Sequence, residues 1–411
     1  MIASPWDAFE AIPPPDKNEH VLVIGAGLAG CWFSRLIAER GIRVRLLDPR
    51  PTAGNGASGN CAGIVKPYVT RQSSSAMAFH VEAWQFLLQQ LEQLQLAAHC
   101  HFTDCGVMQL TRNLYPESEH YQALDAIQGS RLAGVPINCD SIFFARSGWL
   151  NPSLLCRELI NHSLIEFRTG VQVDAISLQD FAGDFQSWEL KCRQTESEAS
   201  RHVVIASGFQ VTQFTQTSAL PVTPARGQIS RFRLKRNTPA LQTVINGRHY
   251  AIPDDRAVVT GATFERDISD DQVRAADHAT NLASLKTLLP DLGVNPVAVD
   301  GSAGVRATTP DRMPLVGPVP DFDDVAHAYA SIHHGRALSE YPALPHWPGL
   351  YVMAGFGSRG IVTTPLAAQA LAEFICDEHP HADNTVFRRW ASLLNPVRFQ
   401  IRNLKRPRRY T

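Results

Sequence analysis

Residues 20–48 of the chain, HVLVIGAGLAGCWFSRLIAERGIRVRLLD, decide the fold. The apolar run Val21–Ile24 predicts a buried parallel strand, and the amphipathic residues after the glycines predict a helix that ends near Gly41. A second apolar run, Val44–Leu47, finishes in Asp48. Strand, glycine turn, helix, strand and terminal acid in this order predict a dinucleotide-binding unit. A generic strand-to-helix turn is the alternative interpretation, and it leaves Asp48 unexplained.

The glycines of the GAGLAG turn each have a mechanical role. Gly25 permits a tight turn, Gly27 lets a pyrophosphate approach the backbone, and Gly30 lets the helix pack closely on the strand. The helix N-terminus offers unpaired N–H groups and a partial positive charge to the phosphates. Asp48 is placed to accept hydrogen bonds from an adenosine ribose. The cofactor contacts expected from this stretch are those of Gly25, Ala26, Gly27, Leu28, Ala29, Gly30 and Asp48.

Length and composition indicate a folded protein of more than one domain. The chain has 411 residues, which is too long for one ordinary core, and 44% of them are hydrophobic. A formal net charge of −1 gives no global sign of a nucleic-acid or membrane partner, so such a signal would have to be local. The N-terminal residues contain acids and prolines and lack the apolar segment of a signal peptide. No apolar run approaches the length of about 20 residues that spans a bilayer, so we expect a cytoplasmic protein without a membrane partner.

The eight cysteines form no CxxC pair and no framework spacing, which predicts reduced thiols. His99, Cys100, His101 and Cys105 lie close together in the sequence, as some metal ligands do. Such a cluster at the end of a helix is more often incidental, and no metal is expected.

Three further segments predict contacts to the same cofactor. The small-residue loop 49–67 is either a flexible surface loop or a second wall of the cofactor site, and its position directly after the dinucleotide unit favours the second interpretation. The strand 203–208, VVIASG, ends in a small turn of the kind found in flavin enzymes with two dinucleotide motifs, whereas a nicotinamide-only dehydrogenase does not need it. Near the C-terminus, GFGSRGI opens a helix through about Ile375 whose dipole would stabilise negative charge on a reduced flavin, although an ordinary turn is the alternative. The expected contacts here are Ser58, Gly59, Asn60, Gly63, Val171, Ala206, Gly208, Gly357, Ser358, Arg359, Gly360 and Ile361.

Residues 221–267 alternate as antiparallel strands separated by polar turns, and residues 271–290 are expected to be helical. The fold class predicted is therefore α/β, with a Rossmann-like FAD-binding domain and an inserted, mostly antiparallel α+β substrate domain. We expect a lead-in at 1–18, a discontinuous FAD-binding domain at 19–98, 146–220 and 300–395, a substrate domain at 99–145 and 221–299, and a basic tail at 396–411.

The C-terminal tail is a local basic segment in an otherwise neutral chain. It contains six Lys and Arg residues and no acid, which makes it a candidate phosphate-binding patch for tRNA. A solvated basic terminus is the simpler alternative. The residues concerned are Arg398, Arg402, Lys405, Arg406, Arg408 and Arg409.

Residues 19–395 resemble the glycine oxidase and D-amino-acid oxidase (DAO) superfamily of FAD enzymes. The resemblance is carried by GAGLAG with Asp48, VVIASG, PARGQ at 224–228, Tyr250 in HYAIP, GVRATTPDRMPLVG and the closing GFGSRGI. Within that superfamily, GASGNCAGIVKP, GVRATTPDRMPLVGPVPD, GSRGIVTTPLAA and the basic end resemble the FAD domain of the MnmC enzymes, which modify the wobble uridine of tRNA. The best-known MnmC members carry a methyltransferase domain ahead of the oxidase domain, and only about eighteen residues precede the first strand here. We therefore expect a stand-alone oxidase part whose product is methylated by a separate protein.

The resemblance implies that non-covalently bound FAD oxidises 5-carboxymethylaminomethyl-(2-thio)uridine at the wobble position, giving 5-aminomethyl-(2-thio)uridine and glyoxylate. It also implies that Arg306 grips the substrate carboxylate, with Tyr250 as a hydroxyl donor and Arg359 holding flavin or substrate. A salt bridge that fixes a turn is the alternative for Arg306, and plain core packing is the alternative for Tyr250. Two rival functions are a glycine- or sarcosine-type small-molecule oxidase and a flavin-bound RNA-binding protein without turnover.

Overall fold

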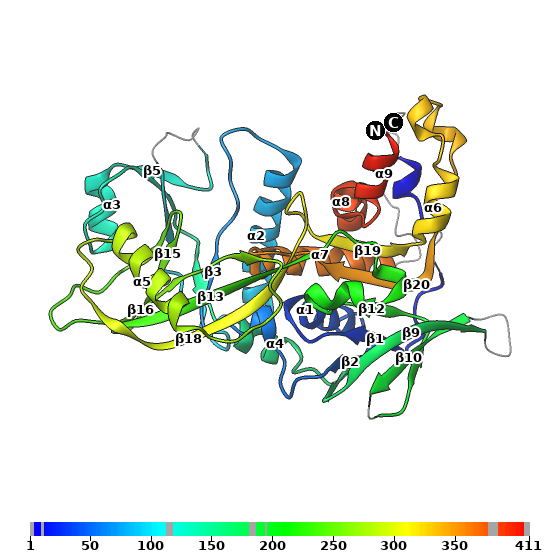
Figure 1. Cartoon of the computed structure of the whole chain (residues 1–411), viewed down its shortest axis with the longest axis horizontal. Coiled ribbons are helices and arrows are strands. Elements are labelled where there is room, and N and C mark those ends of the chain that lie inside the picture. The colour runs from blue at the N-terminus through cyan, green and yellow to red at the C-terminus, as the bar shows by residue number, and fades with distance from the viewer. Residues whose placement is uncertain are drawn as a thin grey trace.

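The computed structural model describes residues 4–9, 12–111, 118–180, 186–193, 195–376 and 385–406. A six-stranded sheet carries the glycine turn (Figure 1). Strand β1 (His20–Ile24) lies near its centre and pairs in parallel with β2 (Arg43–Asp48) and β12 (Val203–Ile205). The sheet continues on one side to β8 (Ile165–Thr169), and on the other to β20 (His346–Ala354) and the antiparallel edge strand β19 (Leu315–Pro320).

Both faces of this sheet are covered, which explains the uninterrupted apolar run in β1. Val21 and Val23 face a core built with helices, and Leu22 and Ile24 face a second core. The helices are α1 (Leu28–Ala38), α2 (Ser75–Gln93), α4 (Pro152–Leu159), α7 (Gly360–Cys376) and α8 (Val386–Leu394). The second core lies under a three-stranded antiparallel sheet of β9 (Gln172–Asp180), β10 (Gln186–Arg193) and β11 (Glu198–Ser200).

A nine-stranded sheet forms the other half of the molecule, on the left of Figure 1. One face packs on α3 (Ala126–Ala133) and α5 (Ala275–Leu288), and the other packs on residues from the stretch 61–81. Its long strand β18 (Val294–Thr308) contains residue 300, where the boundary between the two domains was expected. The remaining strands are β4 (Val107–Leu110), β5 (Gln122–Leu124), β6 (Ser141–Phe144), β13 (Thr223–Leu234), β14 (Val244–Asn246), β15 (Tyr250–Asp254), β16 (Ala257–Gly261) and β17 (Glu265–Arg266).

Two sequence expectations need correction. The alternative role for Arg306 was a salt bridge that fixes a turn, but Arg306 lies at the end of β18, and the turn begins only after Thr308. The basic tail includes a helix, α9 (Arg398–Leu404), which packs beside the N-terminal residues (Figure 1). Asn395 Nδ2 donates to the carbonyl oxygen of Trp6 at 2.6 Å, and Ile401 is buried. Packing against distant segments therefore decides the structure of both stretches.

The smaller elements complete the fold. Strands β3 (Gly63–Val65) and β7 (Gly148–Leu150) form a two-stranded antiparallel sheet, and α6 is Phe322–Ala328. In the part of the chain that the structure describes, no helix is both long and apolar enough to cross a membrane.

Candidate active site

The turn after β1 lies directly against the turn after β12. Gly25 has a φ of +105°, and a Cβ added there would lie 2.6 Å from the carbonyl oxygen of Ala206. The N–H of Ala206 donates to the carbonyl oxygen of Ile24 at 2.8 Å. Gly208, with a φ of +62°, then begins a 3-10 helix. The two glycine-containing turns therefore form one backbone surface, which admits no side chain at Gly25.

The N-terminus of α1 faces the small-residue loop. The N–H of Leu28 donates to Ser58 Oγ at 3.0 Å, and a Cβ added at Gly27 would lie 3.2 Å from the same oxygen. Gly27 is the N-cap residue and has no side chain to satisfy the first amides of the helix. A phosphate group fits this position because its oxygens accept hydrogen bonds from such amides. Asn60, farther along the loop, accepts a hydrogen bond from Ser302 of β18 at 3.1 Å.

Asp48 lies at the carboxyl end of β2 and closes the glycine turn from the side. Its carboxylate accepts hydrogen bonds from the N–H groups of Ala26 at 2.7 Å and Arg50 at 2.9 Å. Burial raises the pKa of Asp48, and these two N–H groups oppose that shift. The N–H of Val171 donates to the carbonyl oxygen of Asp48 at 3.1 Å, which places the predicted contact Val171 beside it.

The GSRG turn before α7 lies beside the start of α1, although the two are more than 300 residues apart in the sequence. A Cβ added at Gly360 would lie 3.9 Å from Leu28 Cδ1, and one added at Gly63 would overlap Ile361. The N–H of Gly357 donates to the carbonyl oxygen of Ala307 at 2.8 Å, while Ser358 is exposed. Glycine turns from the two ends of the chain thus border the same space.

Arg306 and Tyr250 lie on the face of the nine-stranded sheet that packs toward this space. Ser302, Gly304 and Arg306 alternate along β18 on one face, and a Cβ added at Gly304 would lie 2.8 Å from the carbonyl oxygen of Gly56. Burial lowers the pKa of Arg306 and raises the pKa of Tyr250 to about 12, and each group partly offsets the shift of the other. Arg306 has no hydrogen-bond or ion-pair partner among the described residues. It is a half-buried guanidinium beside a neutral phenol, an arrangement suited to a ligand carboxylate.

The sequence family described as FAD dependent oxidoreductase (DAO) matches residues 20–374 of this chain. The chain belongs to this DAO family. FAD as the cofactor and oxidoreductase as the enzyme class, both predicted from the motifs, are thereby confirmed.

Two curated relatives are named tRNA 5-methylaminomethyl-2-thiouridine biosynthesis bifunctional protein MnmC. The protein from Chromobacterium violaceum is 33% identical over 98% of this chain, and the one from Chromohalobacter salexigens is 31% identical over 92% of it. The chain spans 64% and 56% of their respective lengths. The resemblance to MnmC inferred from the motifs is confirmed by these matches.

Solved structures show the same fold. Glycine oxidase from Geobacillus kaustophilus superposes with a TM-score of 0.69 at 20% identity, covering 87% of this chain and 95% of that one. Iminodiacetate oxidase from Chelativorans sp. BNC1 gives a TM-score of 0.67 at 20% identity, covering 86% and 95%. The predicted fold class of this DAO-family chain is therefore confirmed.

The residues around the glycine turns fit FAD. The bare backbone at Gly25 and Gly27 and the free amides of α1 suit its diphosphate, and Asp48 stands at the strand end where a ribose is bound in such folds. Ser207 lies next to the glycine turn, and its Cα is 3.0 Å from a Cβ built at Gly25. Its hydroxyl oxygen Oγ is buried and has no hydrogen-bond partner among the described residues. A buried hydroxyl of this kind is expected to gain a partner when a polar ligand binds.

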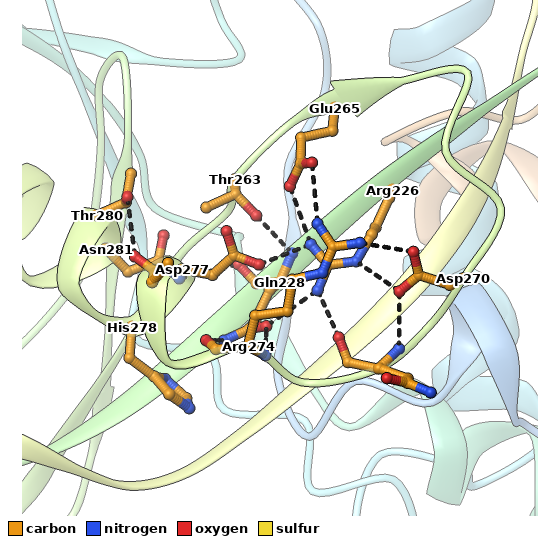
Figure 2. A network of polar contacts seen from close by, with 12 residues as sticks. Arg226, Gln228, Thr263, Glu265, Asp270, Arg274, Asp277, His278, Thr280 and Asn281 are labelled. Atoms are coloured by element: carbon orange, nitrogen blue, oxygen red, sulfur yellow. Dashed lines mark hydrogen bonds and ion pairs between the residues drawn. The ribbon is translucent and has the colours of Figure 1, made fainter.

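A charge network holds the strand beside Arg306 in place (Figure 2). Arg226 on β13 is fully buried, and its guanidinium contacts Asp277 at 2.6 Å and Glu265 at 3.1 Å. Arg226 pairs in register with Val305, so its side chain lies on the opposite face of the sheet from Arg306. Gln228 joins the network by accepting the N–H of Arg274 at 2.7 Å. Between Arg226 and Gln228 lies Gly227, on the Arg306 face.

Substituting Gly227 by alanine is expected to displace the Arg306 guanidinium. The new Cβ would overlap Arg306 Nη1 and lie 2.7 Å from the carbonyl oxygen of Thr263, which belongs to the backbone and yields little. We expect KM for a carboxylate-bearing substrate to rise about 10- to 100-fold, because small misplacements of a positioning group are costly. Steady-state kinetics at equal FAD content would measure this. Gly129→Ala is the matched control, since a Cβ there meets nothing closer than 3.5 Å; an unchanged KM in Gly227→Ala would contradict the expectation.

Sequence reasoning missed a group of residues around Arg359. The Arg359 guanidinium lies over the ring of Tyr68, 4.0 Å from its centroid. Its positive charge lowers the pKa of both Lys66 and His80, which places these two side chains in the same neighbourhood. Lys66 belongs to the quoted segment GASGNCAGIVKP, and a lysine directly after the apolar pair Ile64 and Val65 was the available signal.

The predicted tRNA-binding residues fall into three groups. Arg398 is largely buried, with 9% of its side chain exposed, and it forms a bidentate ion pair with Asp311 at 2.8 and 2.9 Å. It fixes α9 to the fold, so its predicted availability to RNA needs correction. Arg402, Lys405 and Arg406 are exposed. Arg408 and Arg409 lie outside the described residues.

Proposed function

We propose that this chain is a cytoplasmic FAD-dependent oxidase that removes the carboxymethyl group from 5-carboxymethylaminomethyl-(2-thio)uridine at the wobble position of tRNA. The observation that carries the proposal is the half-buried Arg306, which lacks a described partner and lies on the face of β18 that packs against the small-residue loop. A guanidinium without a protein partner can form two parallel N–H···O hydrogen bonds with a ligand carboxylate. The names of the MnmC relatives support a modified tRNA uridine as the molecule that bears this carboxylate.

The proposed reaction is an oxidative cleavage of the carbon–nitrogen bond between the aminomethyl and carboxymethyl groups. Bound FAD supplies the acceptor for the hydride that leaves the glycyl CH2, and the secondary amine loses its proton. The carbon–nitrogen bond of the substrate becomes an imine. Water adds to this imine, and cleavage of the carbon–nitrogen bond releases glyoxylate and leaves the aminomethyl group on the uridine.

In this scheme, the side chains of the protein bind the substrate and position its reacting CH2 group. Arg306 binds the carboxylate and thereby orients the CH2 group. Tyr250, kept neutral because burial raises its pKa to about 12, donates a hydrogen bond. Arg359 stands at the start of α7, where it binds the substrate or the cofactor. A secondary amine bound in its neutral form can lose hydride from the adjacent carbon without a strong side-chain base, because its lone pair assists and its proton then leaves readily, and we assign no such base.

The product implies a following step. The relatives are named for 5-methylaminomethyl-2-thiouridine, whereas this reaction leaves an aminomethyl group. A methyl transfer to the amine must therefore consume the product, and we propose a separate methyltransferase as its source.

The exposed residues of α9 and the turn after it are expected to contribute to tRNA affinity. Replacing Arg402, Lys405 and Arg406 together by glutamine should lower the slope of log affinity against log salt by about 2 to 3, since each lost phosphate contact removes roughly 0.7 to 0.9. Fluorescence anisotropy of labelled tRNA over a salt series would measure it. The matched control replaces three exposed basic residues of the other half, Lys235, Arg236 and Lys286, and an equal loss there would show that the effect is not specific to α9. Substitution is preferable to truncation because Val397 and Ile401 are buried.

Mass spectrometry of the wobble nucleosides tests the function itself. Purified holoenzyme added to tRNA carrying the carboxymethylaminomethyl group should convert it to the aminomethyl form with release of glyoxylate. Without oxygen, the same tRNA should bleach the flavin absorbance, and glycine or sarcosine should not. Bleaching by the amino acids alone would indicate a small-molecule oxidase, and tRNA binding without bleaching would indicate a binding protein.

A further inference from the structure

Lys66 is a half-buried ammonium that keeps one donor without a protein partner among the described residues. Its Nζ donates to Gln109 Oε1 at 2.8 Å and to the carbonyl oxygen of Pro67 at 3.0 Å, and it lies 5.1 Å from the centroid of the Phe144 ring. An ammonium has three donors, so one N–H is left for a ligand. Gln109 and Phe144 are neutral, and no carboxylate contacts Nζ within the described ranges.

The charged neighbour of Lys66 is another cation. Arg359 opposes the charge on Lys66, and Arg312 in turn opposes the charge on Arg359. His80 on α2 packs edge-on against Tyr68, 5.5 Å between ring centroids, and burial lowers its pKa to about 3, so it stays neutral. Its Nδ1 is buried and has no hydrogen-bond partner among the residues described. Cations without an observed counter-charge favour a ligand rich in acceptors.

This group of residues lies on the same sheet face as Tyr250. Gln109, Asn246 and Tyr250 are in-register neighbours on β4, β14 and β15, so their side chains share one face. Neighbouring strands are about 4.8 Å apart, which places Gln109 roughly 10 Å from Tyr250 across the sheet. Lys66, bonded to Gln109, and Arg306, beside Tyr250, therefore stand at two separate positions along one surface.

We propose that Lys66 and Arg359 form a second subsite, which binds the O4 carbonyl edge of the substrate's uracil ring while Arg306 binds the carboxylate. The secondary amine of the proposed substrate joins two arms, one ending in a carboxylate and the other in a uracil whose O4 is adjacent to the substituted C5. Two separate cationic positions match these two arms. This subsite rests on the proposed function. It explains why the enzyme would select a substrate that carries a uracil ring over a simple amino acid.

The subsite has a characteristic pH dependence. Burial, reinforced by Arg359, lowers the pKa of Lys66 to about 7, so the ammonium is charged below that pH and neutral above it. The groups that face Lys66 are Arg359, His80 and Tyr68; Arg359 remains a cation, and burial keeps His80 neutral near pH 7. Because a charged donor binds a carbonyl oxygen more strongly than a neutral amine does, KM for the modified tRNA should rise as the pH rises through 7.

The test compares holoenzyme variants with modified tRNA as substrate. Lys66→Met should raise KM about 10- to 100-fold with little change in kcat, because a hydrogen bond from a charged donor is lost. Its KM should no longer depend on pH near 7. In Lys66→Arg the arginine side chain stays charged at every pH tested, so this variant should keep a low KM and also lose the pH dependence of KM. Lys191→Met, at an exposed lysine of β10, is the matched control and should behave as the wild type.

Three results would overturn the subsite. If wild-type holoenzyme converts modified tRNA and Lys66→Met matches it in KM and pH profile, the subsite is wrong while the function stands. If Lys66→Met is purified without flavin, or its flavin spectrum shifts, the ammonium belongs to the cofactor site. If the wild type does not convert modified tRNA, the proposed function fails and the subsite fails with it. Far-UV circular dichroism and flavin content establish that each variant is folded.

Discussion

Arg306→Met should lower kcat/KM for modified tRNA by about 10²- to 10³-fold, because the substrate carboxylate would then be buried without its cationic partner. FAD content should stay close to that of the wild type, since the substitution leaves the backbone of β18 and its hydrogen bond to the turn before α7 in place. Lysine at this position keeps the charge but loses the bidentate geometry, so Arg306→Lys should recover only part of the loss.

Rapid anaerobic mixing, which follows flavin reduction directly, separates binding from chemistry in this variant. The matched control is Arg233→Met, an exposed arginine on the neighbouring strand β13. If Arg306→Met reduces its flavin at the wild-type rate and affinity, the assignment of the carboxylate site is wrong.

Gly25→Ala is expected to leave the protein nearly free of FAD, with less than about a tenth of the wild-type content. Alanine at a positive φ costs about 1 kcal/mol or more. At Gly25 the added Cβ also meets the carbonyl oxygen of Ala206 at 2.6 Å, so the two turns that we propose to hold the cofactor must move apart. Absorbance at 280 and about 450 nm after purification and FAD reconstitution would measure the content.

Gly41→Ala is the matched control for this substitution. Gly41 has a φ of +83°, but a Cβ there has no neighbour within 4 Å. This variant should lose a little stability and keep its flavin. Equal flavin content in the two variants would mean that the contact between the turns at Gly25 and Ala206 does not matter for FAD binding.

The sequence was informative where the structure depends on local order. The glycine spacing, Asp48 and the apolar run of β1 are consequences of neighbouring residues, and the structure places them as one turn. The apolar spacing of residues 74–98 predicts a helix, as that of 271–290 does, and both helices exist, with bounds Ser75–Gln93 and Ala275–Leu288. Their ends differ because capping and packing, rather than apolar periodicity, decide where a helix stops.

The substrate side could not be predicted to the same depth. Tyr250 and Gln109 share a face because of pairing between β4, β14 and β15, and β4 is more than 130 residues from the other two. Arg398 looked like one of six equivalent basic residues until its ion pair with Asp311 was seen. The role of Gly227 likewise depends on Arg306, which is far from it in sequence but lies on the paired strand. These relations come from strand register, which no local pattern encodes.

Strand β18 connects the two halves of the site. It carries Arg306, and one residue later the carbonyl oxygen of Ala307 accepts the N–H of Gly357 in the turn before α7. A cofactor that orders that turn would therefore also restrain the guanidinium, which amounts to positive heterotropic coupling between two ligands. By thermodynamic reciprocity, a carboxylate bound at Arg306 would tighten the binding of the flavin by the same free energy by which the flavin tightens the binding of the carboxylate.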